Sequence, residues 1–111
     1  MNKERTEKEW IEIQWTTSSL DEARKVARLL VQERYVFSAQ IIPWIESIYY
    51  LGETLDTTQE SKVIIKTEKK HYASIQEIIL KNTHYEVPEI LWFTIGGMYL
   101  PYEEWAETVM R

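Results

Sequence analysis

The chain has 111 residues and is 44% hydrophobic, 13% aromatic and 28% charged, a composition typical of one compact folded domain. Thirteen Lys and Arg against 18 Asp and Glu give a net charge of −5, which argues against nucleic acid and anionic membranes as partners. The absence of Cys excludes disulfides, thiolate metal sites and cysteine nucleophiles.

The sequence shows neither a membrane-spanning run nor an apolar leader. No apolar run approaches the roughly 18 residues that a transmembrane helix requires. Residues 1–9 are charged rather than apolar. We therefore expect residues 1–111 to form one domain in the cytoplasm, with residues 1–8 frayed.

A strand and a helix open the predicted fold. Apolar and polar residues alternate over residues 11–15, which predicts a half-buried strand at 10–15. Ser19 and Glu22 have capping-box spacing, in which each side chain accepts a hydrogen bond from the other's backbone N–H. We expect the helix to run from Leu20 to about Arg34. Its apolar stripe consists of Ala23, Val26, Ala27, Leu30 and Val31.

An extended hairpin follows. Residues 35–51 are rich in Val, Ile, Phe and Tyr, which predicts one long strand. Pro43 lacks an N–H, so the strand should bend there, at an edge or a bulge. We expect residues 52–59 to turn the chain and residues 61–67 to form the returning strand.

The last third of the chain predicts a second helix over 71–81 and a strand over 90–95. A short terminal helix should begin at Pro101. The order β-α-β-β-α-β predicts an α+β, ferredoxin-like fold, in which an antiparallel sheet carries both helices on one face.

The other face of such a sheet would be uncovered. Trp15, Trp92 and Phe93, together with the strand at 35–51, indicate a face too apolar to remain in water. We therefore expect the chain to self-associate.

Motifs for catalysis are weak. The adjacent glycines 96–97 do not precede a Lys-Ser/Thr pair, so no Walker loop is present. A catalytic triad would require His71 or His84 with a Ser or Thr that no nucleophile elbow marks.

Two polar residues have alternative interpretations. His84 lies near Glu86 and Glu89, so it is a weak candidate metal ligand, although a solvated loop explains the same residues. Lys66 is either buried and paired with Glu89 or extended from a strand end into solvent. Aromatic residues such as Tyr49, Tyr85, Tyr102 and Trp105 are expected to pack first and to line a pocket second.

The sequence resembles the family of divalent-cation tolerance proteins named CutA, from Ile11 to about Trp105. The order and spacing of several segments carry this resemblance. The segments are Thr16-Thr17, residues 23–31, Ile41-Ile42-Pro43, Ser47-Ile48-Tyr49, residues 63–67, residues 85–90, Gly96-Gly97 and residues 102–105.

The resemblance implies a ferredoxin-like subunit in a homotrimer whose sheets join edge to edge, with a role in metal-ion tolerance. The chain departs from the family at several positions. Ser38 stands where the family often has Cys, and Thr83-His84-Tyr85 stands where it often has His-Pro-Tyr. Leu51 replaces a Trp, and Trp44 replaces a small residue. These departures argue against a copper-specific site.

Binding, rather than catalysis, is the expected function. We expect a cation or a small ligand to bind at subunit junctions, with no required cofactor and at most weak copper(II) or zinc binding. The candidate site residues are Tyr49, Lys66, Glu86, Glu89 and Trp105, with His84 as a metal candidate. Two alternatives stay open: a structural or signalling trimer that binds a partner protein, and a small acyl-phosphate hydrolase.

Overall fold

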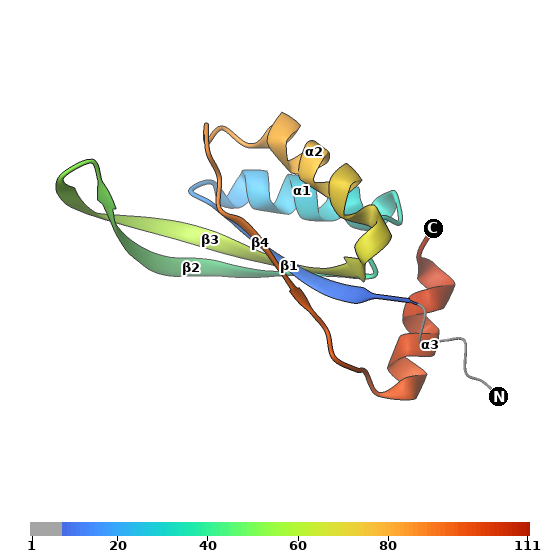
Figure 1. Cartoon of the computed structure of the whole chain (residues 1–111). Helices are drawn as coiled ribbons and strands as arrows, with labels where there is room; N and C mark the ends of the chain where they lie inside the picture. The colour runs from blue at the N-terminus through green and yellow to red at the C-terminus, as the bar shows by residue number, and fades with distance from the viewer. Residues whose placement is uncertain (1–7) are drawn as a thin grey trace.

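The computed structural model describes residues 8–111 and contains one antiparallel sheet with helices on one of its faces. The strands are β1 (Trp10–Thr17), β2 (Ser38–Leu51), β3 (Thr54–Glu68) and β4 (Ile90–Thr94), in the order β2-β3-β1-β4. The helices are α1 (Leu20–Gln32), α2 (Tyr72–Asn82), which follows the 3-10 turn η2 (Lys69–His71), and α3 (Leu100–Val109). Helices α1 and α2 cover one face, and α3 lies apart at the far end of the sheet (Figure 1). This arrangement confirms the predicted ferredoxin-like fold.

The start of α1 confirms half of the predicted capping box. Ser19 Oγ accepts the Glu22 N–H at 3.1 Å. The Ser19 N–H, however, donates to Thr17 Oγ1 at 3.2 Å rather than to Glu22. The helix ends two residues before the predicted Arg34, because Arg34 adopts a left-handed backbone with φ of 62°. The Glu22 carboxylate is thus left for other partners.

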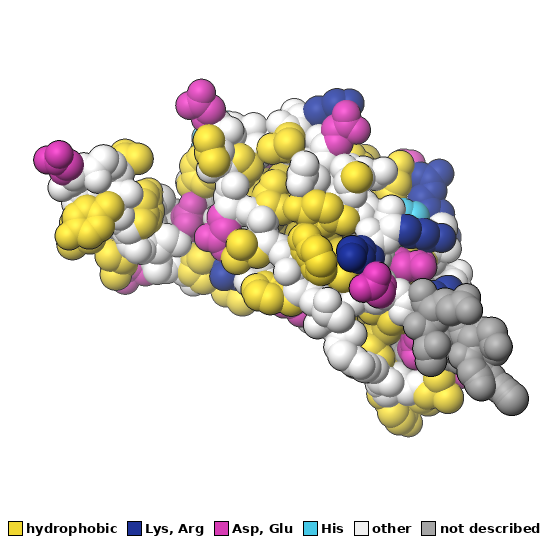
Figure 2. Space-filling view, viewed as in Figure 1, with side chains coloured by type: hydrophobic (Ala, Val, Ile, Leu, Met, Phe, Trp, Pro, Cys, Tyr) yellow, Lys and Arg dark blue, Asp and Glu magenta, His cyan; other side chains and the backbone are white. Residues whose placement is uncertain are grey.

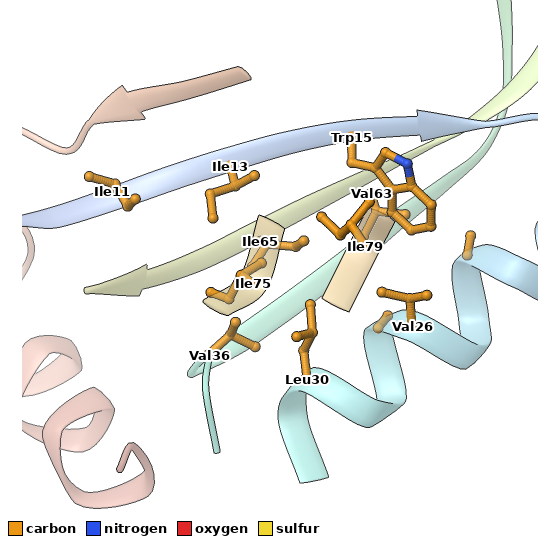
Figure 3. Packing of buried hydrophobic residues seen from close by; sticks show 12 residues of the cluster. Ile11, Ile13, Trp15, Val26, Leu30, Val36, Val63, Ile65, Ile75 and Ile79 are labelled. Atoms are coloured by element: carbon orange, nitrogen blue, oxygen red, sulfur yellow. The ribbon is translucent and has the colours of Figure 1, made fainter. Parts of the chain in front are cut away.

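The core lies between the sheet and the two covering helices. Figure 3 shows side chains from β1, β3, α1 and α2 meeting in one layer. Trp15 is fully buried there, opposite Val63. The members of this core cluster are Ile11, Ile13, Trp15, Ala23, Val26, Ala27, Leu30, Val36, Val63, Ile65, Ile75 and Ile79.

The prediction of which aromatic residues lie on the uncovered face was wrong for two of the three. Trp15 lies on the helix-covered side, and so does Trp92, which pairs with Ile13 and has its ring 6.2 Å from that of Tyr72. Only Phe93, which pairs with Glu12, lies on the open side. Strand alternation does not say which face the helices cover, so the sequence left this assignment open to error.

Hydrogen-bonded polar side chains occupy much of the open face. Gln14 Nε2 donates to Glu12 Oε2 at 2.8 Å, and Lys62 Nζ donates to Gln14 Oε1 at 3.4 Å. Lys66 Nζ donates to Gln40 Oε1 at 2.7 Å. Three apolar residues, Ile42, Leu91 and Phe93, are also exposed on this face.

A further group of exposed apolar residues lies on the distal part of the β2–β3 hairpin, residues 43–60, which we call the arm. Only residues 61–68 of β3 pair with β1, so the arm is a two-stranded ribbon that leaves the sheet. The described chain consequently measures 57 × 25 × 22 Å. Figure 2 shows apolar side chains gathered on the arm. Trp44 is 69% exposed and Tyr50 is 71% exposed, and Ile48, Leu51 and Leu55 are exposed as well.

The structure shortens the predicted turn of the hairpin from eight residues to two. Gly52 has φ of 65°, and β3 begins directly after Glu53, at Thr54. The polar run over 54–59 is threonine-rich and alternates in burial, as strands do, although its polarity resembles a loop. The predicted bend is confirmed, because the register shifts between Ile42 and Ile45, around Pro43.

A second, smaller cluster anchors α3. Ala106 is fully buried against Trp10 and Phe37, and Trp10 Nε1 donates to Glu103 Oε2 at 2.9 Å. The helix begins one residue before the predicted Pro101. Similarly, α2 begins one residue after the predicted His71, and β4 ends one residue before Ile95.

Replacing Trp15 tests the assignment of the core. We expect Trp15→Ala to lower the free energy of unfolding by about 3–5 kcal/mol, because it removes a buried ring and leaves a cavity. Trp15→Phe should cost less, since Phe keeps most of the packing and removes an indole N–H that has no partner among the described residues. Urea unfolding at one protein concentration measures both. Leu80→Ala, on the exposed side of α2, is the control; a Trp15→Ala loss no larger than this control's would contradict the assignment.

Candidate functional site

A groove of about 680 Å³ lies where the arm leaves the sheet. Its walls come from the end of β1, from both strands of the arm and from the loop between α2 and β4. The lining residues are Thr16, Ser47, Ile48, Tyr49, Leu51, Glu60, Tyr85, Glu86, Val87 and Glu89. The groove thus combines three carboxyl groups with an apolar wall.

Glu60 connects the two sides of the groove. Only 9% of this residue is exposed, and its carboxylate accepts hydrogen bonds from Ser47 Oγ and from Tyr85 Oη, each at 2.6 Å. Burial raises the pKa of the Tyr85 phenol, and the hydrogen bond to Glu60 raises it further. The loop is therefore joined to the arm by a hydrogen bond whose donor keeps its proton at neutral pH.

The structure brings three of the five predicted ligand-binding residues to this groove. Tyr49 lies on β2, and its hydroxyl is 2.7 Å from Thr58 Oγ1. Glu86 and Glu89 are exposed on the loop that precedes β4. Together they make the groove acidic and give it one aromatic wall.

The other two predicted residues do not line the groove within one chain. Lys66 lies on the open face of the sheet, where it is bonded to Gln40 and not to Glu89, the partner considered for a buried Lys66. Trp105 lies on α3, where its ring stacks on Tyr102 at a centroid distance of 5.5 Å. Trp105 also contacts Phe37 edge-on, with centroids 6.3 Å apart. Within one chain, both residues therefore lie outside the groove.

His84 has different neighbours from those that its sequence context suggests. Its Nδ1 is 3.0 Å from Glu22 Oε1, and its Nε2 is 2.9 Å from Ser18 Oγ. Its backbone N–H also donates to Glu22 Oε1, at 3.2 Å. The carboxylate beside His84 is therefore that of Glu22 on α1, not that of Glu86 or Glu89. The other histidine, His71, has its Nε2 2.8 Å from the main-chain carbonyl oxygen of Arg111.

Glu22 is held on several sides. Its carboxylate also accepts a hydrogen bond from Thr17 Oγ1 at 2.7 Å. Burial raises the pKa of Glu22, but hydrogen bonds from His84, Thr17 and Thr83, with the charge of His84, outweigh it and place the pKa below 4.5. Glu22 is thus an ionised anchor for the loop that carries His84.

Sequence reasoning missed Ser18, Glu22, Ser47 and Glu60 as members of this region. In the sequence, Glu22 was assigned to the capping box, and Ser18 is one of four consecutive Thr and Ser residues. Ser18 and His84 are 66 positions apart, so no local motif connects them.

Two features are absent from residues 8–111. No group of three or more His, Asp and Glu side chains in that range is arranged to hold a metal ion. Over the same range, no helix is long and apolar enough to cross a membrane.

Comparison with known proteins settles the family. The family described as CutA1 divalent ion tolerance protein matches residues 11–109, nearly the whole chain. The chain belongs to the CutA1 family. The divalent-cation tolerance protein CutA of Thermus thermophilus is 32% identical over 91 residues, which are 81% of this chain and 87% of that protein.

Plant relatives are longer. Protein CutA 1, chloroplastic, of Oryza sativa subsp. japonica is 29% identical over 96 residues, which cover 86% of this chain and 54% of the rice protein. The corresponding Arabidopsis thaliana protein is 30% identical, and 53% of its length is covered. The chain thus spans about half the length of these two relatives. Both are named chloroplastic, so a cytoplasmic location for this chain stays a prediction.

Solved CutA1 structures have the same fold. The crystal structure of CutA1 from Oryza sativa superposes with a TM-score of 0.88 at 28% identity, covering 93% of this chain and 94% of that one. The structure of the Thermus thermophilus protein gives 0.86 at 26% identity, covering 92% and 99%. These matches confirm the resemblance that the sequence motifs indicated.

Removing the charge of Glu22 tests its anchoring role. Because the pKa of Glu22 is lowered in the folded protein, ionised Glu22 favours folding. This contribution to stability is fully present at pH values above the ordinary pKa of 4.5, and it is lost as the pH falls through the lower pKa of the folded state. We expect Glu22→Gln to reduce stability at pH 7, and the gap to the parent protein to close in acid. Thermal unfolding across pH measures this gap. Asp21→Asn, an exposed carboxylate on the same turn, should show a smaller gap; equal gaps would contradict the anchoring role.

Proposed function

We propose that this CutA1-family chain acts as a homotrimer in divalent metal-ion tolerance, and that it binds a cation or a small ligand at subunit junctions. The observation that carries the proposal is the arm, a ribbon whose β2 strand leaves Trp44, Ile48 and Tyr50 exposed in one subunit, directly beside an acidic groove. Assembly and binding therefore share one region of the molecule.

In one subunit, the arm leaves apolar side chains exposed and one edge of the sheet unpaired. An isolated two-stranded hairpin has marginal stability in water, because few of its side chains are buried. In addition, β2 is an edge strand of 14 residues, which presents a long row of backbone groups for pairing with another copy. Closed point-group assembly of identical subunits would cover both the edge and the apolar side chains.

The groove has the charge and the shape to bind a cation or a small ligand. Glu60, Glu86 and Glu89 favour cationic ligands, while Tyr49 offers an aromatic wall. Because the groove is bordered by the arm, a second copy that covers the arm would also border the groove. In such a junction, Lys66 and Trp105 of a neighbouring copy are available as further contacts.

A metal, if bound, should be held weakly. The groove of one chain supplies oxygen atoms and no sulfur, and carboxylate oxygens are poor ligands for copper(I). His84 is the histidine nearest in sequence to Glu86 and Glu89 of the groove, but both of its ring nitrogens already have protein partners. A tight site would need ligands from a second copy, and we expect no required cofactor.

A second candidate function is the binding of a partner protein. The specific observation is the aromatic surface at the start of α3, where the N-cap residue Tyr99 is 78% exposed and Tyr102 and Trp105 stack on each other. Aromatic residues are enriched at protein interfaces. This surface would suit a structural or signalling trimer, and it lies on a different part of the subunit from the groove.

Light scattering tests assembly. At micromolar concentration we expect a molar mass of three subunits of 13.3 kDa each. Trp44→Lys should shift the protein towards monomer, because an unpaired charge in a packed junction is costly to bury. Val31→Lys, at an exposed position on α1 away from the arm, should remain trimeric. A parent protein that stays monomeric would contradict the proposal.

Calorimetry with copper(II) and zinc tests the metal prediction. We expect millimolar affinity that is unchanged by His84→Ala and lowered further in the double variant Glu86→Gln, Glu89→Gln. Glu77→Gln, an exposed carboxylate on α2, is the control and should have no effect. Submicromolar binding that is lost in His84→Ala would contradict the prediction and would make His84 a genuine ligand.

A further inference from the structure

Three side chains at the edge of the groove form a continuous hydrogen-bonded chain. Ser18 Oγ is 2.9 Å from His84 Nε2, and His84 Nδ1 is 3.0 Å from Glu22 Oε1. An ionised carboxylate can only accept, so Nδ1 carries the hydrogen that it donates to Glu22. In the neutral imidazole, Nε2 then accepts the hydrogen of the Ser18 hydroxyl. The order of atoms is that of a serine nucleophile, a general base and an orienting acid.

The surroundings hold this arrangement in place. The Glu22 side chain is only 12% exposed, and it bonds both Thr17 Oγ1 and the His84 backbone N–H. The imidazole lies beside the Tyr85 ring, with centroids 4.8 Å apart. The Glu22 carboxylate accepts two hydrogen bonds from His84, which fix both the loop and the ring, as an orienting residue must do.

The nucleophile position is open to a substrate. Ser18 is exposed, and it directly precedes Ser19, the N-cap of α1. The N-terminus of this 13-residue helix carries a partial positive charge, which would stabilise negative charge that develops on a substrate oxygen. Tyr85, which lines the groove, follows His84 in the chain, and its ring lies against the imidazole, so a molecule in the groove would lie close to the Ser18–His84 pair.

We propose that Ser18 is a nucleophile activated by His84, with Glu22 as the positioning residue, and that this site hydrolyses small carboxylic esters. The groove suggests the substrate class. Ile48, Leu51 and Val87 suit an apolar acyl or alcohol group, whereas the carboxylates repel anions. The substrate is therefore an uncharged or cationic ester. The inference goes beyond the proposed function, which assigns only reversible binding to this region.

The reaction balances with water as the only co-reactant. Ser18 Oγ adds to the carbonyl carbon while its proton passes to His84 Nε2. The bond from that carbon to the alcohol oxygen breaks, and the alcohol leaves with the proton. Water then attacks the acyl-Ser18 ester and gives its proton to Nε2, which returns it to Ser18 Oγ as the carboxylic acid leaves.

Covalent labelling of the full chain tests the nucleophile. An alkyl fluorophosphonate reacts with activated serines, and mass spectrometry of the digested protein locates the adduct. We expect the adduct on Ser18 and its loss in His84→Ala. Two controls should keep it: His71→Ala removes the other histidine, and Ser74→Ala removes an exposed serine on α2. No adduct on Ser18, or an adduct that survives His84→Ala, would overturn the proposal.

Hydrolysis of p-nitrophenyl acetate tests the activity. Ser18→Ala and His84→Ala should each lower kcat/KM by about 100-fold relative to the parent, since general-base activation contributes about that much. Glu22→Gln should lower kcat with KM unchanged, because a positioning residue acts on the chemical step. Circular dichroism must show all three variants folded.

The reference variants for this assay are again His71→Ala and Ser74→Ala. Equal rates in the parent and Ser18→Ala would overturn the proposal. Such a failure leaves the proposed function untouched, because light scattering and metal calorimetry do not involve Ser18.

Discussion

The length of the hairpin is the constraint on which the rest of this structure depends. Strands β2 and β3 have 14 and 15 residues, whereas β1, the strand that joins them to the core, has eight. The sheet and its two helices can therefore bury only the base of the hairpin, where Val63 and Ile65 face the core. The remainder extends as the arm, and its apolar side chains need a cover that the subunit itself does not provide. Self-association therefore follows from the difference in length between β1 and the two strands of the hairpin.

The loop between α2 and β4 links that constraint to the functional region. On one side, Tyr85 bonds Glu60 at the base of the arm; on the other, His84 bonds Glu22 at the start of α1. Adjacent residues of one loop thus hold the arm and the helical layer in a fixed relation. The groove lies at the first of these connections, and the Ser18–His84–Glu22 chain lies at the second. A change in how the arm is covered would therefore alter the geometry of both the groove and the Ser18–His84–Glu22 chain.

The sequence predicted the order of elements, because each has a clear period or cap, and it predicted most of the core stripe of α1. It failed where local patterns have two explanations. The threonine-rich run of β3 resembles a loop, and the alternation around Trp15 is the same whichever face the helices cover. The residues of the site were harder to predict from the sequence. Tyr49, Glu86 and Glu89 were found through family motifs, but Glu22 already had a role in the capping pattern, and its partner His84 is 62 positions away. Contacts between such distant residues depend on the packing of the loop against α1, which no local pattern encodes.

Hydrogen–deuterium exchange of the arm reports directly whether another copy of the chain covers the exposed ribbon in solution. At micromolar concentration we expect amides over residues 45–51 and 54–60 to be protected as strongly as those of β1. Trp44→Lys should remove this protection of the arm while β1 keeps its own. Rapid exchange of the arm in the parent protein, alongside a protected β1, would contradict the claim that another copy of the chain covers it.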